Sequence, residues 1–403
     1  MTRARLVLLL IFLWALLPLA GCWDAEELNR RAVVSGIGID LAPEKQGYLV
    51  SFQVIIADEI SGKSGRGATP TMVYSAQGRS VMEAVRKVSL LVPRMVSTAH
   101  TRIVVISEEL ARQGISDIAD FLDRDSDIRL TTKIYVAKNG VRARDIISAL
   151  APMGKITAYT LAQKTEITAK AFGANYSVEI DDVIRDMLVP NSGPVINGVD
   201  ILGNVEEASK KNNLEKTDNL GLLCMSNLAL FKGDRLKGWL DEEESLGLVW
   251  IKGIMNQTVV VIAPDGQGEI SLDVRRSKTS TQLILKDPNH PVIRVKVTAQ
   301  LSVREMDSTV DLRDPAALSA LELYVDKEIV KKMKAAVSKA QALNIDIFGF
   351  GQRFERQHPN EWKKLKGQWS DLFPKLKIEY QVDSIVRNSQ MRDRSFKYDL
   401  KEE

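Results

Sequence analysis

The sequence predicts a mixed α+β fold distributed over two or three domains. Short apolar runs that are typical of strands alternate with segments whose apolar residues recur every three or four positions, as on one face of a helix. The chain has 403 residues, and a domain usually contains about 100–200. Its composition, 45% hydrophobic and 27% charged, is that of a chain that folds around apolar cores.

Residues 1–21 predict a cleaved export signal. Arg3 and Arg5 precede an uncharged, apolar block at 6–21, and charged residues follow it directly. As a helix the block would be roughly 24 Å long, which is shorter than the ~30 Å hydrocarbon core of a membrane. A removable signal peptide therefore fits better than a permanent transmembrane helix.

Residues 19–22 read Leu-Ala-Gly-Cys, which resembles the lipobox of bacterial lipoproteins. In such proteins the signal is cut before the cysteine, whose thiol carries a diacylglyceryl group. We therefore expect Cys22 to be S-diacylglycerylated, open to N-acylation, and attached to the lipid bilayer. Two acyl chains anchor a protein stably, whereas a single chain does not. The alternative is a chance cysteine at the end of an ordinary signal.

The charge and cysteine counts exclude several classes of protein. A net charge of +3 argues against nucleic-acid binding through bulk positive charge. Two cysteines exclude a disulfide scaffold, and with three histidines they do not suggest a zinc site. Cys224 lies in the apolar run 220–225, so a buried, inert thiol is expected.

Residues 22–193 predict an N-terminal α+β domain that ends at the turn-rich segment 190–194. Its clearest helix is expected at 80–91, where apolar residues recur at helical steps up to Leu91 or Val92. Strands are expected at 32–40, 48–56, 102–106 and 134–137, and further helices from 108 onward and at 144–150 and 178–189.

The segment 61–67 is rich in glycine and serine and is expected to form a loop. It contains a Gly-Lys-Ser sequence, but Ala57 stands where a phosphate-binding loop needs its first glycine. No nucleotide site is therefore expected there.

Residues 194–276 predict a β-rich middle domain. Strands are expected at 222–231, 258–263 and 269–274. The acidic run 241–244 is expected to form an exposed loop.

Residues 277–403 predict a C-terminal α+β domain with one long helix at 315–342. Asp314 and Pro315 provide an N-cap followed by proline at the first helical position. The apolar stripe of this helix is formed by Leu318, Leu321, Val325, Ile329, Met333, Val337 and Ala340. Lysines 327, 331, 332 and 334 lie mostly off the stripe and are interpreted as a solvated face, with contact to anionic lipid headgroups as the alternative. Strands are expected at 283–285, 292–299 and 376–382.

No pattern in the chain indicates catalysis. His100, His290 and His358 are far apart and lack metal-ligand spacing, and no nucleophile elbow of the Gly-x-Ser-x-Gly type occurs. The aspartate pairs at 123/125 and 181/182 are interpreted as helix caps and surface charges. We expect no enzyme activity, no catalytic residue, no cofactor and no metal site.

Several motifs resemble a known family along nearly the whole mature chain. They lie in order at 21–24, 27–29, 36–40, 100–105, 110–115, 121–125, 229–240, 246–253, 346–351, 359, 362–363 and 369. Together they are similar to the Ger(x)C family, the lipoprotein C subunits of bacterial spore germinant receptors. The loop at 61–67 has no counterpart in the family pattern.

The resemblance implies three domains, each a sheet flanked by helices, on the outer face of the spore inner membrane. It also implies a non-catalytic subunit that assembles with two membrane partners, the A and B subunits, and that signals or assists assembly during spore germination. Binding of a small molecule by this subunit itself is not expected. Trp239, Trp250, Phe348 and Trp362 are expected to be packing anchors.

Two other functions remain open at this point. A solute-binding lipoprotein that serves a membrane transporter would have two lobes around one deep polar pocket. An extracellular enzyme would have a cleft with convergent titratable groups.

Replacement of the predicted lipid-bearing residue tests the anchor. We expect Cys22→Ala to move the protein from the membrane fraction to the soluble fraction, because the thiol that carries the diacylglyceryl group is lost. Cys224→Ser is the matched control and should remain with the membrane. A Cys22→Ala protein that still sediments with lipid would contradict the prediction.

Overall fold

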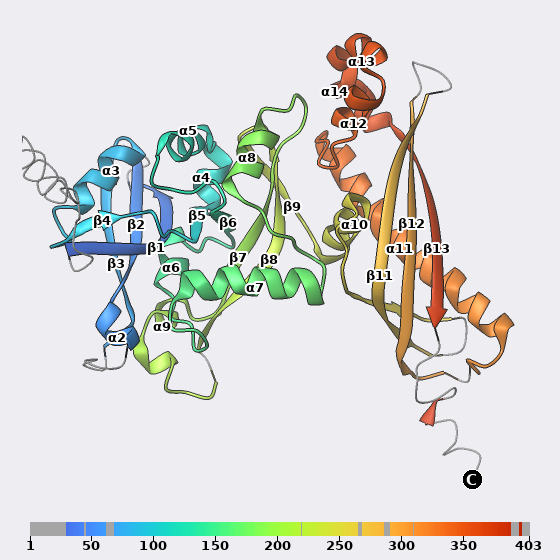
Figure 1. Ribbon diagram of the computed structural model, residues 1–403, viewed down its shortest axis with the longest axis horizontal. Coiled ribbons are helices and arrows are strands. Elements are labelled where there is room, and N and C mark those ends of the chain that lie inside the picture. Colours follow the sequence, from blue (N-terminus) through green and yellow to red (C-terminus); the bar gives the residue numbers. More distant parts are fainter. Residues whose placement is uncertain are drawn as a thin grey trace, which may run out of the picture.

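Two β-sheets organise the computed structural model, which describes residues 30–43, 46–61, 68–218, 220–264, 268–285, 291–308, 310–387 and 395–396. The first sheet has the strand order β3-β2-β1-β5-β6-β7-β8-β9, with β4 paired to β1, and the second has the order β10-β11-β12-β13 (Figure 1). We call the first sheet and its helices the N-terminal unit, and the second sheet with α10–α14 the C-terminal unit.

Parallel strands form the centre of the first sheet. β1 (Arg31–Leu41) lies parallel to β5 (Ile103–Ser107), and its first residues also pair with β4 (Met95–Ser97). β6 (Lys133–Ala137) and β7 (Val195–Gly203) continue the parallel order. β5 is buried along its whole length, as expected for a strand covered by helices on both faces.

Antiparallel strands extend this sheet at both ends. On one side β2 (Tyr48–Ile55) pairs with β1, and β3 (Thr71–Gly78) pairs with β2. On the other side β8 (Gly221–Lys232) pairs with β7, and β9 (Arg235–Leu240) pairs with β8.

Helices cover both faces of the first sheet and create two separate cores (Figure 1). Along β5, Val104 and Ile106 belong to one core and Ile103 and Val105 to the other, because successive strand residues face opposite sides. The helices of the first face are α3 (Val81–Val88), α4 (Glu108–Gln113), α5 (Ser116–Arg124) and α8 (Ile180–Met187). Those of the second face are α6 (Ala143–Ser148), α7 (Thr157–Ala171) and α9 (Val205–Ala208), and the short α2 (Ala57–Ser61) follows β2.

The second sheet is covered on one face only. Its strands are β10 (Val259–Ile262), β11 (Ile270–Ile284), β12 (Val292–Met306) and β13 (Lys377–Arg387). Its helices are α10 (Glu242–Lys252), α11 (Pro315–Leu343), α12 (Phe350–Gln357), α13 (Pro359–Leu365) and α14 (Trp369–Leu372). On β12, Val295 and Val297 are buried in the core whereas Arg294 and Lys296 are exposed, so this sheet has one solvated face.

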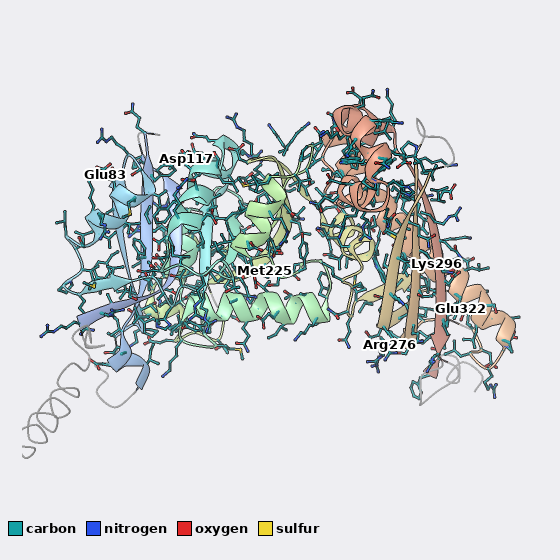
Figure 2. The ribbon with its side chains drawn as sticks, turned by 45° about the horizontal axis from the view of Figure 1, so that its top comes forward. Glu83, Asp117, Met225, Arg276, Lys296 and Glu322 are labelled. Atoms are coloured by element: carbon teal, nitrogen blue, oxygen red, sulfur yellow. The ribbon has the colours of Figure 1, made fainter. Side chains whose placement is uncertain are left out.

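Charged side chains lie at both ends of the long axis. Figure 2 shows Glu83 and Asp117 in the N-terminal unit and Lys296 and Glu322 in the C-terminal unit.

The long helix expected at 315–342 is confirmed as α11. Asp314 caps it by accepting a hydrogen bond from the backbone N–H of Ala316 at 2.9 Å, and Pro315 occupies the first turn. The expected apolar stripe is buried from Leu321 onward, and Ala336 joins it. Lys331 is exposed and Lys332 half-buried, each in an ion pair with Glu328.

The prediction of an exposed loop at the acidic run 241–244 is wrong. Asp241 is the N-cap of α10, and residues 242–244 form the first turn of this helix. The carboxylate of Asp241 accepts a hydrogen bond from the N–H of Glu244, and the Glu244 carboxylate accepts one from the N–H of Asp241, both at 2.8 Å. This capping box satisfies two backbone donors, and acidic side chains in the first turn also suit the helix dipole.

Several elements carry little sequence signal and were not expected: α5, α7, β3, β7 and β9. α7 buries Thr157, Ala158, Leu161 and Thr165, so its inner face lacks an apolar stripe. The helix expected at 80–91 ends at Val88. Of the two residues proposed to end its apolar face, Leu91 is exposed and Val92 is buried.

The expectation of one sheet per domain is corrected to two sheets in the described part of the chain. β7, β8 and β9 belong to the expected middle domain 194–276, but they extend the N-terminal sheet, because the edge of β6 pairs with β7. β10 and β11 belong to the second sheet, and the boundary expected at 276/277 lies within β11. A division into three domains remains a prediction.

The close approach of α10 to α11 depends on Gly247. A Cβ atom at this position would lie 2.0 Å from the carbonyl oxygen of Lys332 in the α11 backbone. We expect Gly247→Ala to lower the free energy of unfolding by about 2 kcal/mol, since two packed helices must separate. Urea denaturation measures the effect.

Gly367→Ala is the matched control, because a Cβ there meets no atom within 4 Å. It should stay within about 0.5 kcal/mol of the parent protein. Equal stability of the two variants would contradict the role of Gly247.

Candidate functional site

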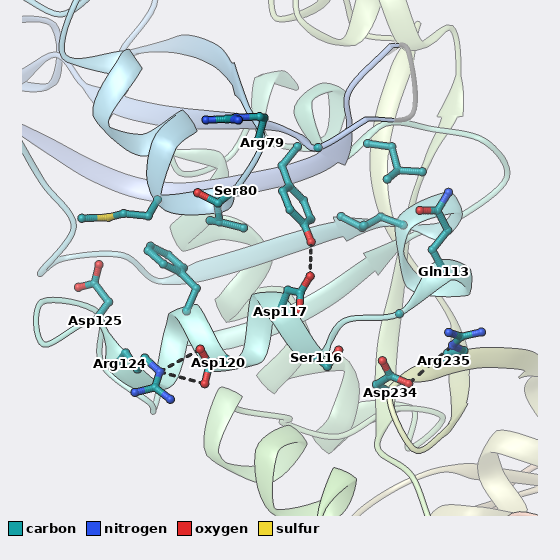
Figure 3. Close-up of a pocket in the computed structure, with 18 residues that line it drawn as sticks. Arg79, Ser80, Gln113, Ser116, Asp117, Asp120, Arg124, Asp125, Asp234 and Arg235 are labelled. Atoms are coloured by element: carbon teal, nitrogen blue, oxygen red, sulfur yellow. Dashed lines mark hydrogen bonds and ion pairs between the residues drawn. The ribbon is translucent and has the colours of Figure 1, made fainter.

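A groove of about 860 Å³ lies on the N-terminal unit between α3, α5 and the β8–β9 turn (Figure 3). It is lined by Tyr48, residues 79–82, residues of α4 and α5, and the turn residues Asp234 and Arg235. All its lining residues come from the N-terminal unit, so it does not lie between the two sheets, where a solute-binding protein of two lobes would place its pocket.

Two pairs of polar side chains in this groove bond to one another. Tyr48 Oη donates a hydrogen bond to Asp117 Oδ2 at 2.9 Å, and Arg124 Nε donates to both carboxylate oxygens of Asp120 at 2.9 Å (Figure 3). Burial, reinforced by Asp117, raises the pKa of Tyr48 to about 12, so its hydroxyl stays protonated at neutral pH. These four side chains are thus engaged within the protein, and the residues that line the groove include no histidine or cysteine.

A second hollow of about 430 Å³ surrounds His100. It contains Arg102, whose guanidinium lies 5.3 Å from the ring centre of Tyr159, and Lys133, whose Nζ lies 3.1 Å from a carboxylate oxygen of Glu166. His100 is exposed, and Arg102 and Lys133 are engaged with protein groups.

The histidines that the structure describes are not brought together. His100 lies in the N-terminal unit, and His358 lies in the C-terminal unit, 6.2 Å from the ring of Phe354. His290 lies outside the described residues. Within the described part of the chain, no group of three or more His, Cys, Asp or Glu side chains is arranged to hold a metal ion.

The aspartate pairs act as caps and surface charges, as expected. Asp182 completes a capping box at the start of α8 by accepting a hydrogen bond from the N–H of Glu179 at 3.1 Å, and Asp181 pairs with Arg185. Asp125 Oδ1 accepts a hydrogen bond from the N–H of Asp127 at 2.9 Å.

Cys224 is half-buried on β8, less deeply than expected. Its thiol donates a hydrogen bond to the carbonyl oxygen of Asp200 at 3.5 Å. Burial, followed by the nearby charge of Asp200, raises the pKa of this thiol, so the neutral form is favoured. Cys22 and the signal segment 1–21 lie outside the described residues.

The motif at 36–40 has a structural explanation. Asp40 is buried and accepts hydrogen bonds from the N–H groups of Ala143 and Arg144 at 2.7 and 3.0 Å, which caps the start of α6. A Cβ at Gly38 would lie 3.0 Å from the backbone of Ala143. Burial raises the pKa of Asp40, and the two backbone donors act against that rise.

The motif at 346–351 and the tryptophans that follow form one buried cluster. Asp346 accepts hydrogen bonds from the N–H groups of Phe350 and Gly351 at 3.0 and 2.7 Å and from Nε1 of Trp369 at 3.2 Å. A Cβ at Gly351 would lie 2.9 Å from the ring of Trp362. Asp346 begins the family motif, but its role as a buried acceptor was not predicted, although its place between two isoleucines was a signal of burial.

The expected packing anchors are largely confirmed. Trp250, Phe348 and Trp362 are buried. Trp239 is half-buried and joins β9 to α4, since its Nε1 donates a hydrogen bond to Glu108 Oε1 at 3.1 Å.

The two units meet around Lys252. Its Nζ lies 5.4 Å from the ring centre of Tyr176. Burial lowers the pKa of Lys252, and the negative charge of Asp186 partly offsets this effect. Close by, Ser192 Oγ donates a hydrogen bond to the carbonyl oxygen of Asp346 at 2.8 Å.

Among the helices that the structure describes, none has both the length and the apolar character that a membrane span requires.

Comparison with known proteins matches almost the whole chain. Residues 24–201 match the model of the spore germination protein N-terminal domain, and residues 226–390 match the model described as "spore germination B3/GerAC like, C-terminal". Spore germination protein KC of Bacillus subtilis (strain 168) is 31% identical over 407 residues, covering 99% of each chain. Spore germination protein B3 of the same strain is 22% identical over 382 residues, covering 94% of this chain and 96% of its own.

A solved structure supports the fold. The crystal structure of the GerBC protein superposes with a TM-score of 0.53 at 19% identity, and the match covers 91% of this chain and 100% of that one. At this identity the likeness establishes the fold alone.

Removal of the Asp346 carboxylate tests the buried cluster. We expect Asp346→Ala to lower the free energy of unfolding by about 3 kcal/mol, because three buried N–H groups lose their acceptor. Asp346→Asn should cost about 1 kcal/mol, since the amide oxygen still accepts. The substitution also removes the cost of a buried carboxylate, whose pKa is raised by burial.

Asp371→Ala is the control for this test. Asp371 is exposed near the same cluster, and its loss should change the free energy of unfolding by less than about 0.5 kcal/mol. Thermal and urea unfolding measure all three variants. An Asn variant as unstable as the Ala variant would contradict the acceptor role.

Proposed function

Since the chain belongs to the family of GerAC-like spore germination proteins, the C subunits of germinant receptors, we propose that it is a lipid-anchored, non-catalytic subunit of a nutrient germinant receptor. The observation that carries the proposal is the match to both family regions in order, together with a relative that aligns over 99% of the chain. Two independent partial matches in the same order are far more specific than any single motif.

The proposed location is the outer face of the spore inner membrane. It rests on the lipobox ending at Cys22 and on the charged segment that follows it. The diacylglyceryl group on Cys22 would hold the folded units beside the membrane, close to membrane-embedded A and B subunits.

The proposed role is assembly of the receptor or transmission of its signal. The groove on the N-terminal unit supports this role rather than catalysis, because its titratable groups are engaged in pairs such as Tyr48–Asp117 and Asp120–Arg124. The family motifs at 36–40 and 346–351 are explained by helix capping and aromatic packing, so they serve the shape of the subunit. A rigid body of this kind suits a subunit that binds other proteins.

Deletion of the gene tests the function in the organism that carries it. We expect spores that form normally but germinate poorly in response to one class of nutrient, because the receptor is incomplete. The wild-type gene and Cys224→Ser should restore germination, whereas Cys22→Ala should restore little of it. Loss of optical density after nutrient addition measures the response. Normal germination, in a strain without a second receptor for that nutrient, would contradict the proposal.

Calorimetry separates this function from that of a solute-binding lipoprotein. The purified mature protein is titrated with nutrient amino acids and sugars, and no heat of binding is expected. Tight binding by the subunit alone would favour the solute-binding alternative.

A further inference from the structure

Large apolar side chains gather on the surface at the end of α3. Just after the helix, Leu90 is 83% exposed, Leu91 53% and Met95 58%. We call these three residues the end patch. Exposed apolar residues scattered singly are ordinary, whereas a contiguous group marks a surface that contacts something apolar.

The end patch is not required by the core of the unit. α3 already buries Val81, Ala84 and Val88 against the sheet, and the helix ends before Leu90. Leu90 and Leu91 follow the C-cap residue Ser89 and point away from this buried face.

The end patch lies beside the place where the chain enters the first sheet. Met95 begins β4 and pairs directly with Arg31, the first residue of β1. Cys22 precedes Arg31 by nine residues, a length that spans at most about 30 Å when fully extended. A lipid group on Cys22 would therefore leave the end patch within reach of the bilayer surface.

The segment that carries the end patch has more basic than acidic residues. Residues 79–95 contain four basic residues and one acid. The acid, Glu83, already forms ion pairs with Lys87 at 2.8 Å and Arg79 at 3.6 Å. Arg86 and Arg94 add further positive charge. Leucine and methionine framed by arginine and lysine fit an anionic lipid surface, where apolar groups enter the interface and cations contact headgroups.

We propose that the end patch inserts into the headgroup region of an anionic membrane and fixes the orientation of the subunit. The proposal rests on the proposed lipid anchor at Cys22. A protein partner fits this surface less well, because the end patch has no aromatic residue, and aromatic residues dominate protein–protein hot spots.

The proposed contact has a consequence for the whole molecule. α3 and β4 lie at one end of the long axis, and α11 and β13 lie at the other (Figure 1). Insertion of the end patch would place the N-terminal unit at the lipid surface and hold the C-terminal unit away from it.

A nitroxide label at position 90 tests the contact. The lipidated mature protein carrying Leu90→Cys and Cys224→Ser is labelled and reconstituted into vesicles of equal parts phosphatidylcholine and phosphatidylglycerol. The acylated Cys22 does not react with the label. Leu323→Cys in the same background is the matched control, because Leu323 is 62% exposed on α11 in the C-terminal unit.

We expect the ratio of oxygen to nickel-chelate accessibility at position 90 to rise several-fold over that at position 323. Equal ratios at the two positions would overturn the proposal. The membrane subunits are then added to the same vesicles. If the label at position 90 becomes shielded from both reagents only at this step, the proposal is overturned in favour of a protein partner.

Mass spectrometry of the same sample separates this inference from the proposed function. Cys22 without acyl chains would contradict the anchor itself. Acylated Cys22 with a water-exposed label at position 90 would leave the anchor standing and refute only the insertion of the end patch.

Discussion

The structure depends on the burial of α10 between the two units. Residues 245–251 of this helix are all buried, with β8 and β9 on one side and α11 and β11 on the others. Gly247 allows the backbone of α11 to approach, and the carbonyl oxygen of Trp250 accepts a hydrogen bond from Thr279 on β11 at 2.8 Å. One apolar core therefore runs from Leu228 and Leu230 on β8 to the inner face of the second sheet. The two units are joined by core packing and not only by a linker.

This arrangement explains why neither family region is a complete structural unit. The first matched region, 24–201, contains strands up to β7, whereas most of β8 and all of β9 belong to the second, 226–390. The nine-stranded sheet is completed only when both are present, since β8 covers the edge of β7 that would otherwise expose unpaired backbone groups. The two family regions therefore share the first sheet, and the two units share one apolar core.

Several buried polar groups with hydrogen-bond partners help to maintain the shape of the molecule. Asp40 and Asp346 each cap a helix from a neighbouring segment, and Gln53 donates a hydrogen bond to the carbonyl oxygen of Ile147 at 2.6 Å. Such groups specify one packing arrangement, because any displacement leaves them without partners. On the open face of the second sheet, by contrast, the charged side chains form ion pairs that remain in contact with water, such as Arg294–Glu379 and Lys296–Asp383.

The sequence alone determined the features that depend on local patterns. The lipobox at Cys22, the caps and stripe of the helix at 315–342, most of the strands and the family resemblance all follow from short segments. Only the tertiary structure decided that the strands after residue 194 join the first sheet, because hydrogen bonding to β6 links residues distant in sequence. It also decided that α7 packs through small and polar residues, and that Val92 is buried whereas Leu91 is not. An apolar residue in a sequence shows what could be buried, and only the neighbours that the fold supplies decide whether it is.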